Sequence, residues 1–237
     1  MALTVQQMRP MAHVPFILGV LRRLEVASVV DSLIPPHPEH VLSTGRGVEA
    51  LVLAMLDGEH ALYKVGPRLE ERGMIPLLQP GLTRASLHDD RFGRILDALF
   101  TANLNQVFSA IALKALEVYA LPPPWLHQDT TTIALYGAYA DEPQSAGAPR
   151  PAYGHSKDGR DGLKQVLLSL GVSGDGGIPL RLGVRDGNRR DSVAPPLAIE
   201  ECLALGLEGR RGIVADSKAY SRRTLGVCLE HKIDLVT

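Results

Sequence analysis

The chain has 237 residues, 45% hydrophobic and 22% charged, a composition that is ordinary for a folded globular protein and argues against extensive disorder. The longest unbroken apolar run, residues 50–56, is far too short to span a bilayer, and no basic region followed by an apolar stretch opens the chain. We therefore expect a cytoplasmic protein of one or two domains with no membrane partner. The two cysteines, Cys202 and Cys228, lack the spacing and the companion histidine of a zinc site, so we interpret both as reduced and buried.

The formal net charge is −1, which taken alone is weak evidence against a nucleic-acid partner. The charges are unevenly distributed, because residues 150–237 contain 14 Lys and Arg against 11 Asp and Glu, whereas residues 1–149 contain 11 against 15. Basic residues in the second half would attract a phosphodiester backbone and release its counterions. A solvated surface would give the same counts, so charge alone leaves both interpretations open.

The first half of the chain is predicted to be a helical bundle, because its apolar residues recur at helical spacing. The predicted helices cover residues 14–30, 47–57, 61–71, 87–100 and 102–119. Thr44 is a possible cap, Gly58 ends a helix, and residues 74–86, with two prolines and a glycine, predict a loop. The stiff connector of prolines 122–124 places the domain boundary between residues 1–120 and 121–237.

Several polar residues of the bundle have ordinary explanations. The run from His88 to Arg91 could contact metal or DNA, but acids at a helix start stabilise the helix dipole, which we favour. His37 and His40, in a proline-rich segment, are expected to be solvated. Neither charge nor helix-turn-helix spacing identifies the bundle as a reader of DNA.

The second half contains two acids in strand-like settings. Residues 125–137, WLHQDTTTIALYG, predict a buried strand with one acid, Asp129, and residues 213–215 predict a short strand that ends at Asp216 before a helix. A carboxylate within a sheet needs a positive or hydrogen-bonding partner, and a divalent metal is an efficient one. The two acids therefore predict one metal site that the fold assembles.

Between the acids, residues 166–172 and 178–184 predict two strands joined by a Gly-rich turn, SGDGG. This turn lacks the Lys-Ser/Thr ending of a nucleotide loop. Asn188 and Asp191 fit a turn and the cap of a helix that begins near residue 192, without any chemistry. A final strand is predicted at residues 233–236.

Taken in order, five blocks resemble one family. They are the Asp-Thr-Thr strand, GHSKDGR at residues 154–160, the hairpin through DGGIP, DGN-x-x-D, and VADSKAYS at residues 214–221. Together they resemble the core of bacterial insertion-sequence transposases of the DDE type, in the branch that carries GHSKD. The region before Leu121 resembles the helical domain that precedes such cores.

The resemblance implies a fold class and a function. The fold is an α/β (α+β) one, in which a helical N-terminal bundle precedes a partial ribonuclease-H-like mixed sheet with flanking helices. Asp129 and Asp216 take the places of the first two catalytic acids and metal ligands, for two Mg²⁺ (or Mn²⁺) ions about 3.5–4 Å apart that support phosphodiester cleavage and strand transfer. The implied partners are double-stranded DNA at transposon ends and further copies of the chain or a full-length transposase.

Candidate DNA contacts follow from the same blocks. They are His155, Lys157, Arg160, Arg189, Arg190 and Lys218. For the residues of GHSKDGR, a polar loop that leads into the next strand is an equally good interpretation.

The family likeness also implies a third acid, a Glu on a helix after the last strand. After Asp216 the only glutamate is Glu230, which precedes that strand, while Glu200 and Glu201 precede Asp216. We therefore expect a C-terminally truncated transposase with little activity of its own. Two alternatives stay open: a non-catalytic DNA-binding or dimerising regulator of transposition, and a decaying fragment with an exposed sheet edge.

Overall fold

The computed structural model describes residues 8–121, 125–137, 139, 147–154, 159, 162–188, 196, 199–200 and 212–237. The chain divides into two compact units, Met1–Lys114 and Ala115–Thr237. Within the described residues no single helix has the length and hydrophobicity to cross a bilayer. The helices Asp89–Thr101 and Leu104–Val118 reach the required length and hydrophobicity only when taken together, and they are bent by 89° at the break between them.

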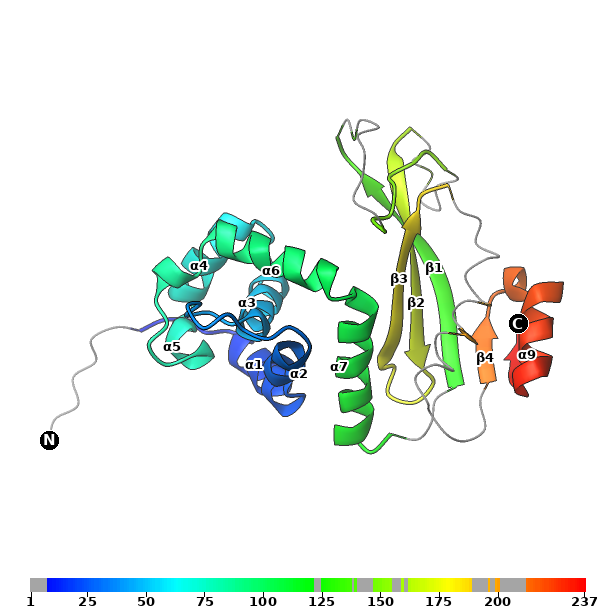
Figure 1. Cartoon of the computed structure of the whole chain (residues 1–237), viewed down its shortest axis with the longest axis horizontal. Helices are drawn as coiled ribbons and strands as arrows, with labels where there is room; N and C mark the ends of the chain where they lie inside the picture. Colours follow the sequence, from blue (N-terminus) through cyan, green and yellow to red (C-terminus); the bar gives the residue numbers. More distant parts are fainter. Residues whose placement is uncertain are drawn as a thin grey trace, which may run out of the picture. The chain divides into compact units, whose positions relative to one another are not determined.

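The first unit is built from helices (Figure 1). Its helices are α1 (Val14–Arg23), α2 (Val26–Leu33), α3 (Thr44–Leu56), α4 (Leu62–Glu71), α5 (Ile75–Leu78), the 3-10 turn η1 (Arg84–Ser86), α6 (Asp89–Thr101) and α7 (Leu104–Val118), the last of which continues into the second unit. The ring of His88 accepts a hydrogen bond from the Arg91 backbone N–H at 3.3 Å, and Asp89 and Asp90 occupy the first turn of α6. These residues form a helix start, as predicted.

Three predictions for this unit are wrong in detail. Residues 14–30 form two helices, because Glu25 adopts a left-handed backbone (φ 53°) between α1 and α2. The predicted loop at residues 74–86 contains α5, whose proline lies in the first turn, where a missing N–H leaves no helical bond unmade. Ser43 caps α3 in place of Thr44, accepting from the Arg46 backbone N–H at 3.1 Å.

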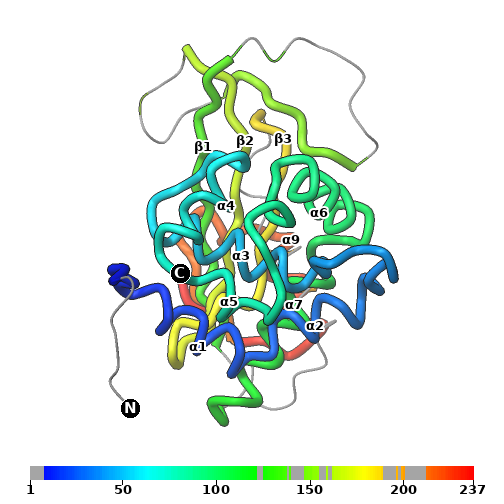
Figure 2. Tube along the Cα trace, turned by 90° about the vertical axis from the view of Figure 1, so that its left-hand side faces the viewer, coloured from blue at the N-terminus to red at the C-terminus, as the bar shows by residue number. Residues whose placement is uncertain are grey.

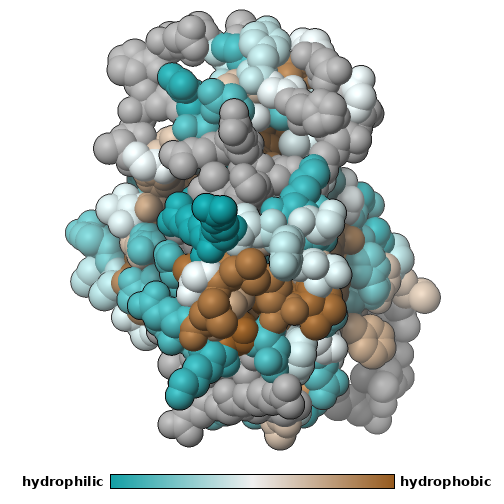
Figure 3. Space-filling model, turned by 90° about the vertical axis from the view of Figure 1, so that its right-hand side faces the viewer, coloured by the Kyte–Doolittle hydropathy of each residue, from teal (hydrophilic) through white to brown (hydrophobic). Residues whose placement is uncertain are grey.

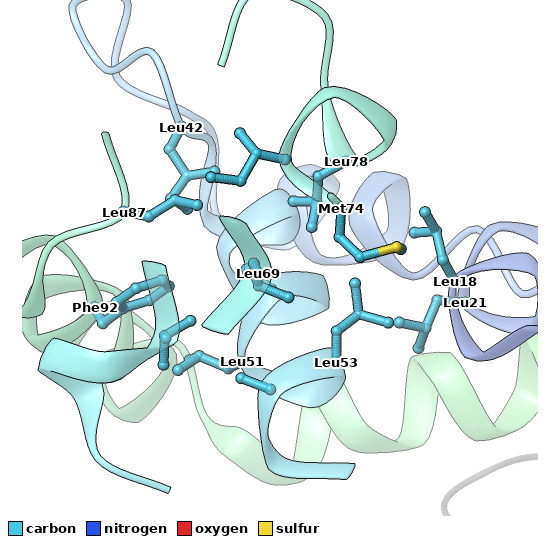
Figure 4. Close-up of a cluster of buried hydrophobic side chains, with 14 of the residues drawn as sticks. Leu18, Leu21, Leu42, Leu51, Leu53, Leu69, Met74, Leu78, Leu87 and Phe92 are labelled. Carbon is cyan, nitrogen blue, oxygen red and sulfur yellow. The ribbon is translucent and has the colours of Figure 1, made fainter. Parts of the chain in front are cut away.

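The hydrophobic core of this unit surrounds α3, which contacts α1, α2, α4, α5 and α6. Leu53, Leu69, Met74 and Phe92 are fully buried in it (Figure 4). Gly45 lets α2 and α3 approach closely, since a Cβ at this position would lie 2.1 Å from the Ala27 carbonyl oxygen. The bundle therefore has a complete core of its own.

The second unit contains one five-stranded mixed sheet (Figures 1 and 2). Its strands are β1 (Trp125–Leu135), β2 (Lys164–Ser173), β3 (Pro179–Asp186), β4 (Gly212–Ala215) and β5 (Asp234–Val236), in the order β3-β2-β1-β4-β5. The hairpin strands β1, β2 and β3 pair antiparallel, whereas β1 pairs with β4, and β4 with β5, in parallel. This combination of helices and mixed sheet confirms the predicted fold class and is consistent with a partial ribonuclease-H-like fold.

Two short helical elements follow β4. They are the 3-10 turn η3 (Ser217–Ala219) and α9 (Arg222–His231). Ser221 caps α9 by accepting from the Thr224 backbone N–H at 3.2 Å, and Lys232 ends it with a left-handed backbone (φ 55°). The connector of prolines 122–124 lies outside the described residues, as does half of the segment between β1 and β2. Of the helix predicted to begin near residue 192, only residues 196, 199 and 200 are described, and they are helical.

Candidate metal centre

The two faces of β1 differ in exposure, and this difference decides where Asp129 lies. Even-numbered residues from Leu126 to Thr132 are buried, while the odd-numbered residues from His127 to Ile133 are exposed. Asp129 belongs to the exposed face. The prediction of a buried strand is thus correct for one face only, and the carboxylate reaches solvent without being desolvated.

Strand register brings the second acid next to the first. The parallel ladder between β1 and β4 ends with Gln128 paired to Ala215, and the next residues on the two strands are Asp129 and Asp216. Asp216 keeps an extended backbone (φ −69°, ψ 168°), so it continues the direction of β4 for one more residue. Paired residues of neighbouring parallel strands lie about 4.8 Å apart and share a face. The fold therefore brings the two predicted acids together.

Each carboxylate is oriented by a nearby backbone N–H. Asp129 Oδ1 accepts a hydrogen bond from the Thr130 backbone N–H at 2.7 Å. Asp216 Oδ1 accepts one from the Lys218 backbone N–H at 3.1 Å, and through this bond the Asp216 side chain caps η3. Both acids are exposed. Their carboxylates are consequently held close to rigid main chain on a solvent-accessible part of the sheet.

A buried polar network lies behind Asp129, on the opposite face of the sheet. The Gln128 side-chain amide donates to the Asp129 carbonyl oxygen at 2.9 Å and to Ser169 Oγ at 2.8 Å, and Arg181 Nη1 donates to the same Oγ at 2.9 Å. All three side chains belong to buried residues. This network was not predicted from the sequence, although polar residues at the buried positions of alternating strands are its signal.

Two neighbouring carboxylates fit a magnesium ion, which proteins commonly bind through one or two carboxylates together with substrate phosphate oxygens and water. Among the described residues no group of three or more His, Cys, Asp and Glu is placed to hold a metal ion. Asp129 and Asp216 would thus be the ligands from this part of the chain, and the remaining positions suit a phosphate and water.

The other predicted site residues divide into two groups. Lys218 is exposed in η3, two residues after Asp216. The other predicted DNA contacts lie outside the described residues; they are His155, Lys157, Arg160, Arg189 and Arg190. Cys202 also lies outside them, whereas Cys228 is a buried free thiol, and its burial raises its pKa.

A family model described as "Domain of unknown function (DUF4277)" matches residues 6–113, which lie in the helical unit. No curated protein matches the sequence.

Solved structures that resemble the chain are complexes of Mos1 transposase. The paired-end complex with the left transposon end has 10% sequence identity and a TM-score of 0.32, and the match covers 80% of this chain and 57% of that one. The mariner paired-end complex with Mn has 10% identity and a TM-score of 0.33, with 81% of this chain and 58% of that one covered. The strand transfer complex has 11% identity and a TM-score of 0.33, with 81% of this chain and 57% of that one covered. The chain thus spans a little over half the length of these structures.

Proposed function

We propose that this chain belongs to the DDE-type transposases of the bacterial insertion-sequence branch that carries GHSKD. The main support is the register of the sheet, because the parallel ladder between β1 and β4 ends one residue before Asp129 and Asp216, which are both exposed. The order of sequence blocks from the first strand to VADSKAYS supports it independently.

In this proposal the acids form the binding site for Mg²⁺ or Mn²⁺. Asp129, on the central strand, would contact two ions in a complete core, and Asp216 would contact one of them. When bound, the ions supply activation of water or a 3′-hydroxyl and stabilisation of the leaving oxygen in phosphodiester cleavage and strand transfer. The chain contributes fixed positions, because the Thr130 N–H of β1 donates to the Asp129 carboxylate and the Lys218 N–H of η3 donates to the Asp216 carboxylate.

The substrate of the proposed site is double-stranded DNA at a transposon end. Lys218 lies beside Asp216, where its ammonium group would attract a phosphate and offset the repulsion between DNA and the two acids. We assign the same role to His155, Lys157, Arg160, Arg189 and Arg190 because they belong to the family-like blocks.

Metal binding tests the proposed ligands directly. We expect Asp129→Asn and Asp216→Asn each to weaken Mn²⁺ binding at least tenfold in isothermal titration, because each removes one of two charged ligands. The matched control is Asp175→Asn, an exposed acid in the turn between β2 and β3, which should leave the affinity unchanged.

DNA binding separates the ligand role from a structural role. Asp129→Asn should leave the affinity for end DNA nearly intact in a gel-shift assay without metal, whereas Lys218→Ala should lower it. Equal loss of metal and DNA binding in Asp129→Asn, with a reduced unfolding temperature, would show that Asp129 supports the fold and is not a ligand.

A non-catalytic regulator of transposition is the second candidate function. The observation that favours it is the position of Glu230, which lies on exposed α9 before β5 and therefore not where the family likeness implies a third acid. We expect the 237-residue polypeptide to bind labelled ends and to cleave them poorly with Mn²⁺. Efficient cleavage that Asp129→Asn abolishes would reject the regulator.

A further inference from the structure

Helix α9 has two bases in its first turn and an acid in its last turn. Arg222 and Arg223 occupy its first turn, which contains no acid, and Glu230 lies in its last turn. The helix dipole favours acids at the start and bases at the end, so these three charges oppose it, whereas His231 in the last turn and Lys232 after it agree with it.

The outward face of α9 places these charges around a glycine. Thr224 and Cys228 are the buried residues of the helix and define its inner face. Gly226 lies opposite them at the centre of the outer face, and nothing lies within 4 Å of a Cβ built on it. Arg222 and Glu230, four residues to either side, lie on the same exposed face.

Hydrophobic side chains accompany the charges. Leu229 is 80% exposed on α9 and Val236 is 49% exposed on β5, the edge strand of the sheet. The space-filling view of the side that carries α9 shows hydrophobic residues gathered at the centre of that face, with hydrophilic residues around them (Figure 3). An exposed hydrophobic patch with a charged rim is typical of an interaction surface.

We propose that α9 is a homodimer interface, in which the helix packs antiparallel against α9 of a second copy across a two-fold axis at Gly226. Within one helix, Arg222 and Glu230 are about 12 Å apart and cannot pair. In the antiparallel arrangement Arg222 meets Glu230 of the second copy, and Glu230 meets its Arg222. The same surface patch serves both copies, as a two-fold interface requires.

This arrangement also accounts for the glycine and the leucine. Gly226 at the axis lets the two helix backbones approach closely, and Leu229 covers the aliphatic part of Arg223 on the second copy. A contact between two ten-residue helices is small, so the dimer is a weak one with a dissociation constant in the micromolar range. The inference does not depend on the metal centre.

Charge exchange tests the proposed pairing in the full chain by sedimentation equilibrium. Arg222→Glu should raise the dimer dissociation constant about tenfold, because it places two glutamates opposite each other at both ends of the interface. Glu230→Arg should have the same effect, because it places two arginines there. The double variant carrying both changes should restore dimerisation. Arg94→Glu, an exposed arginine of α6, is the matched control and should have no effect.

A second variant separates assembly from folding. Gly226→Gln introduces a better helix former on an exposed face, so the monomer should be as stable or more stable, while its side chain should hold the helices apart and weaken the dimer at least tenfold. A wild-type chain that stays monomeric to several hundred micromolar would overturn the proposal. So would failure of the double charge exchange to restore assembly, or a Glu230→Arg change that alters DNA binding and leaves assembly unchanged.

Discussion

Asp57 shows how a single buried residue links two helices of the first unit. Its side chain is 4% exposed, and Arg72 contacts its two oxygens at 2.8 and 3.0 Å. Arg68 approaches the same carboxylate at 3.1 Å. The hydrogen bond from Arg72 holds the pKa of Asp57 below its ordinary value, in spite of the burial that would raise it. The ion cluster therefore ties the end of α3 to α4 only while Asp57 is charged.

The lowered pKa of Asp57 predicts a pH dependence of stability. Asp57 binds a proton more readily in the unfolded chain than in the folded one, so its contribution is complete above about pH 4 and is lost as pH falls through the lower, folded pKa. We expect Asp57→Asn to lower the free energy of unfolding by about 2 kcal/mol at pH 7 and by much less at pH 3. Urea unfolding at several pH values measures this difference.

An exposed acid provides the control for Asp57. Asp97→Asn changes an exposed carboxylate of α6 and should leave both the stability and its pH dependence nearly unchanged. A constant difference between wild type and Asp57→Asn from pH 3 to pH 7 would contradict the proposed role of the charge.

At the scale of elements, close packing between helices depends on particular glycines. Gly45 of α3 faces the α2 backbone, and its N–H donates to Asp31 at 2.7 Å. Gly93 of α6 has no neighbour within 4 Å of an added Cβ. Substitution by alanine should therefore lower the stability of the protein at Gly45 and raise it at Gly93.

We expect Gly45→Ala to destabilise the protein by about 1–3 kcal/mol, because the methyl group meets backbone that must move. Gly93→Ala should stabilise it by about 0.5–1 kcal/mol, since alanine is the better helix former and the space is open. Thermal unfolding followed by circular dichroism compares the two. Equal shifts of the same sign would show that helix propensity, rather than the α2–α3 contact, controls both.

The spacing of apolar residues predicted the helices and strands in which that spacing is regular. It failed where the backbone of a single residue interrupts a helix. The strands of the hairpin and the strand before Asp216 were predictable because alternation and turn composition are local properties. The break at Glu25 was not predictable, because residues other than glycine rarely adopt a left-handed backbone and the local sequence does not mark this glutamate as an exception.

For the candidate site, the two acids could be predicted from the sequence, but their surroundings could not. A carboxylate among β-branched residues pointed to Asp129, and the end of a short strand pointed to Asp216. The exposure of Asp129 was not predictable, because the sequence of one strand does not say which of its faces the rest of the unit covers. The support from Gln128 and Ser169 depends on pairing between distant segments and was missed for the same reason.

At the scale of the whole molecule, the helical unit has what it needs to fold by itself. Its buried core cluster extends from Val14 to Val107 and includes no residue of the sheet. We expect a polypeptide of residues 1–121 to be helical by circular dichroism and to unfold cooperatively in urea, because its apolar burial is internal. A non-cooperative transition would show that the core is incomplete without the second unit.

The two-residue repeat of β1 has a consequence for how such a chain can change. Deleting one residue between the start of β1 and Asp129, while the hairpin pairing slips to match, would turn the acid toward the layer of Ser169 and Arg181 and carry Gln128 to the water side. The charge would then be buried, and the other side chains of the strand that follow would exchange faces with it. A change of length here would therefore destabilise the sheet as well as alter the chemistry, whereas the loops at either end can grow or shrink without reversing the acid.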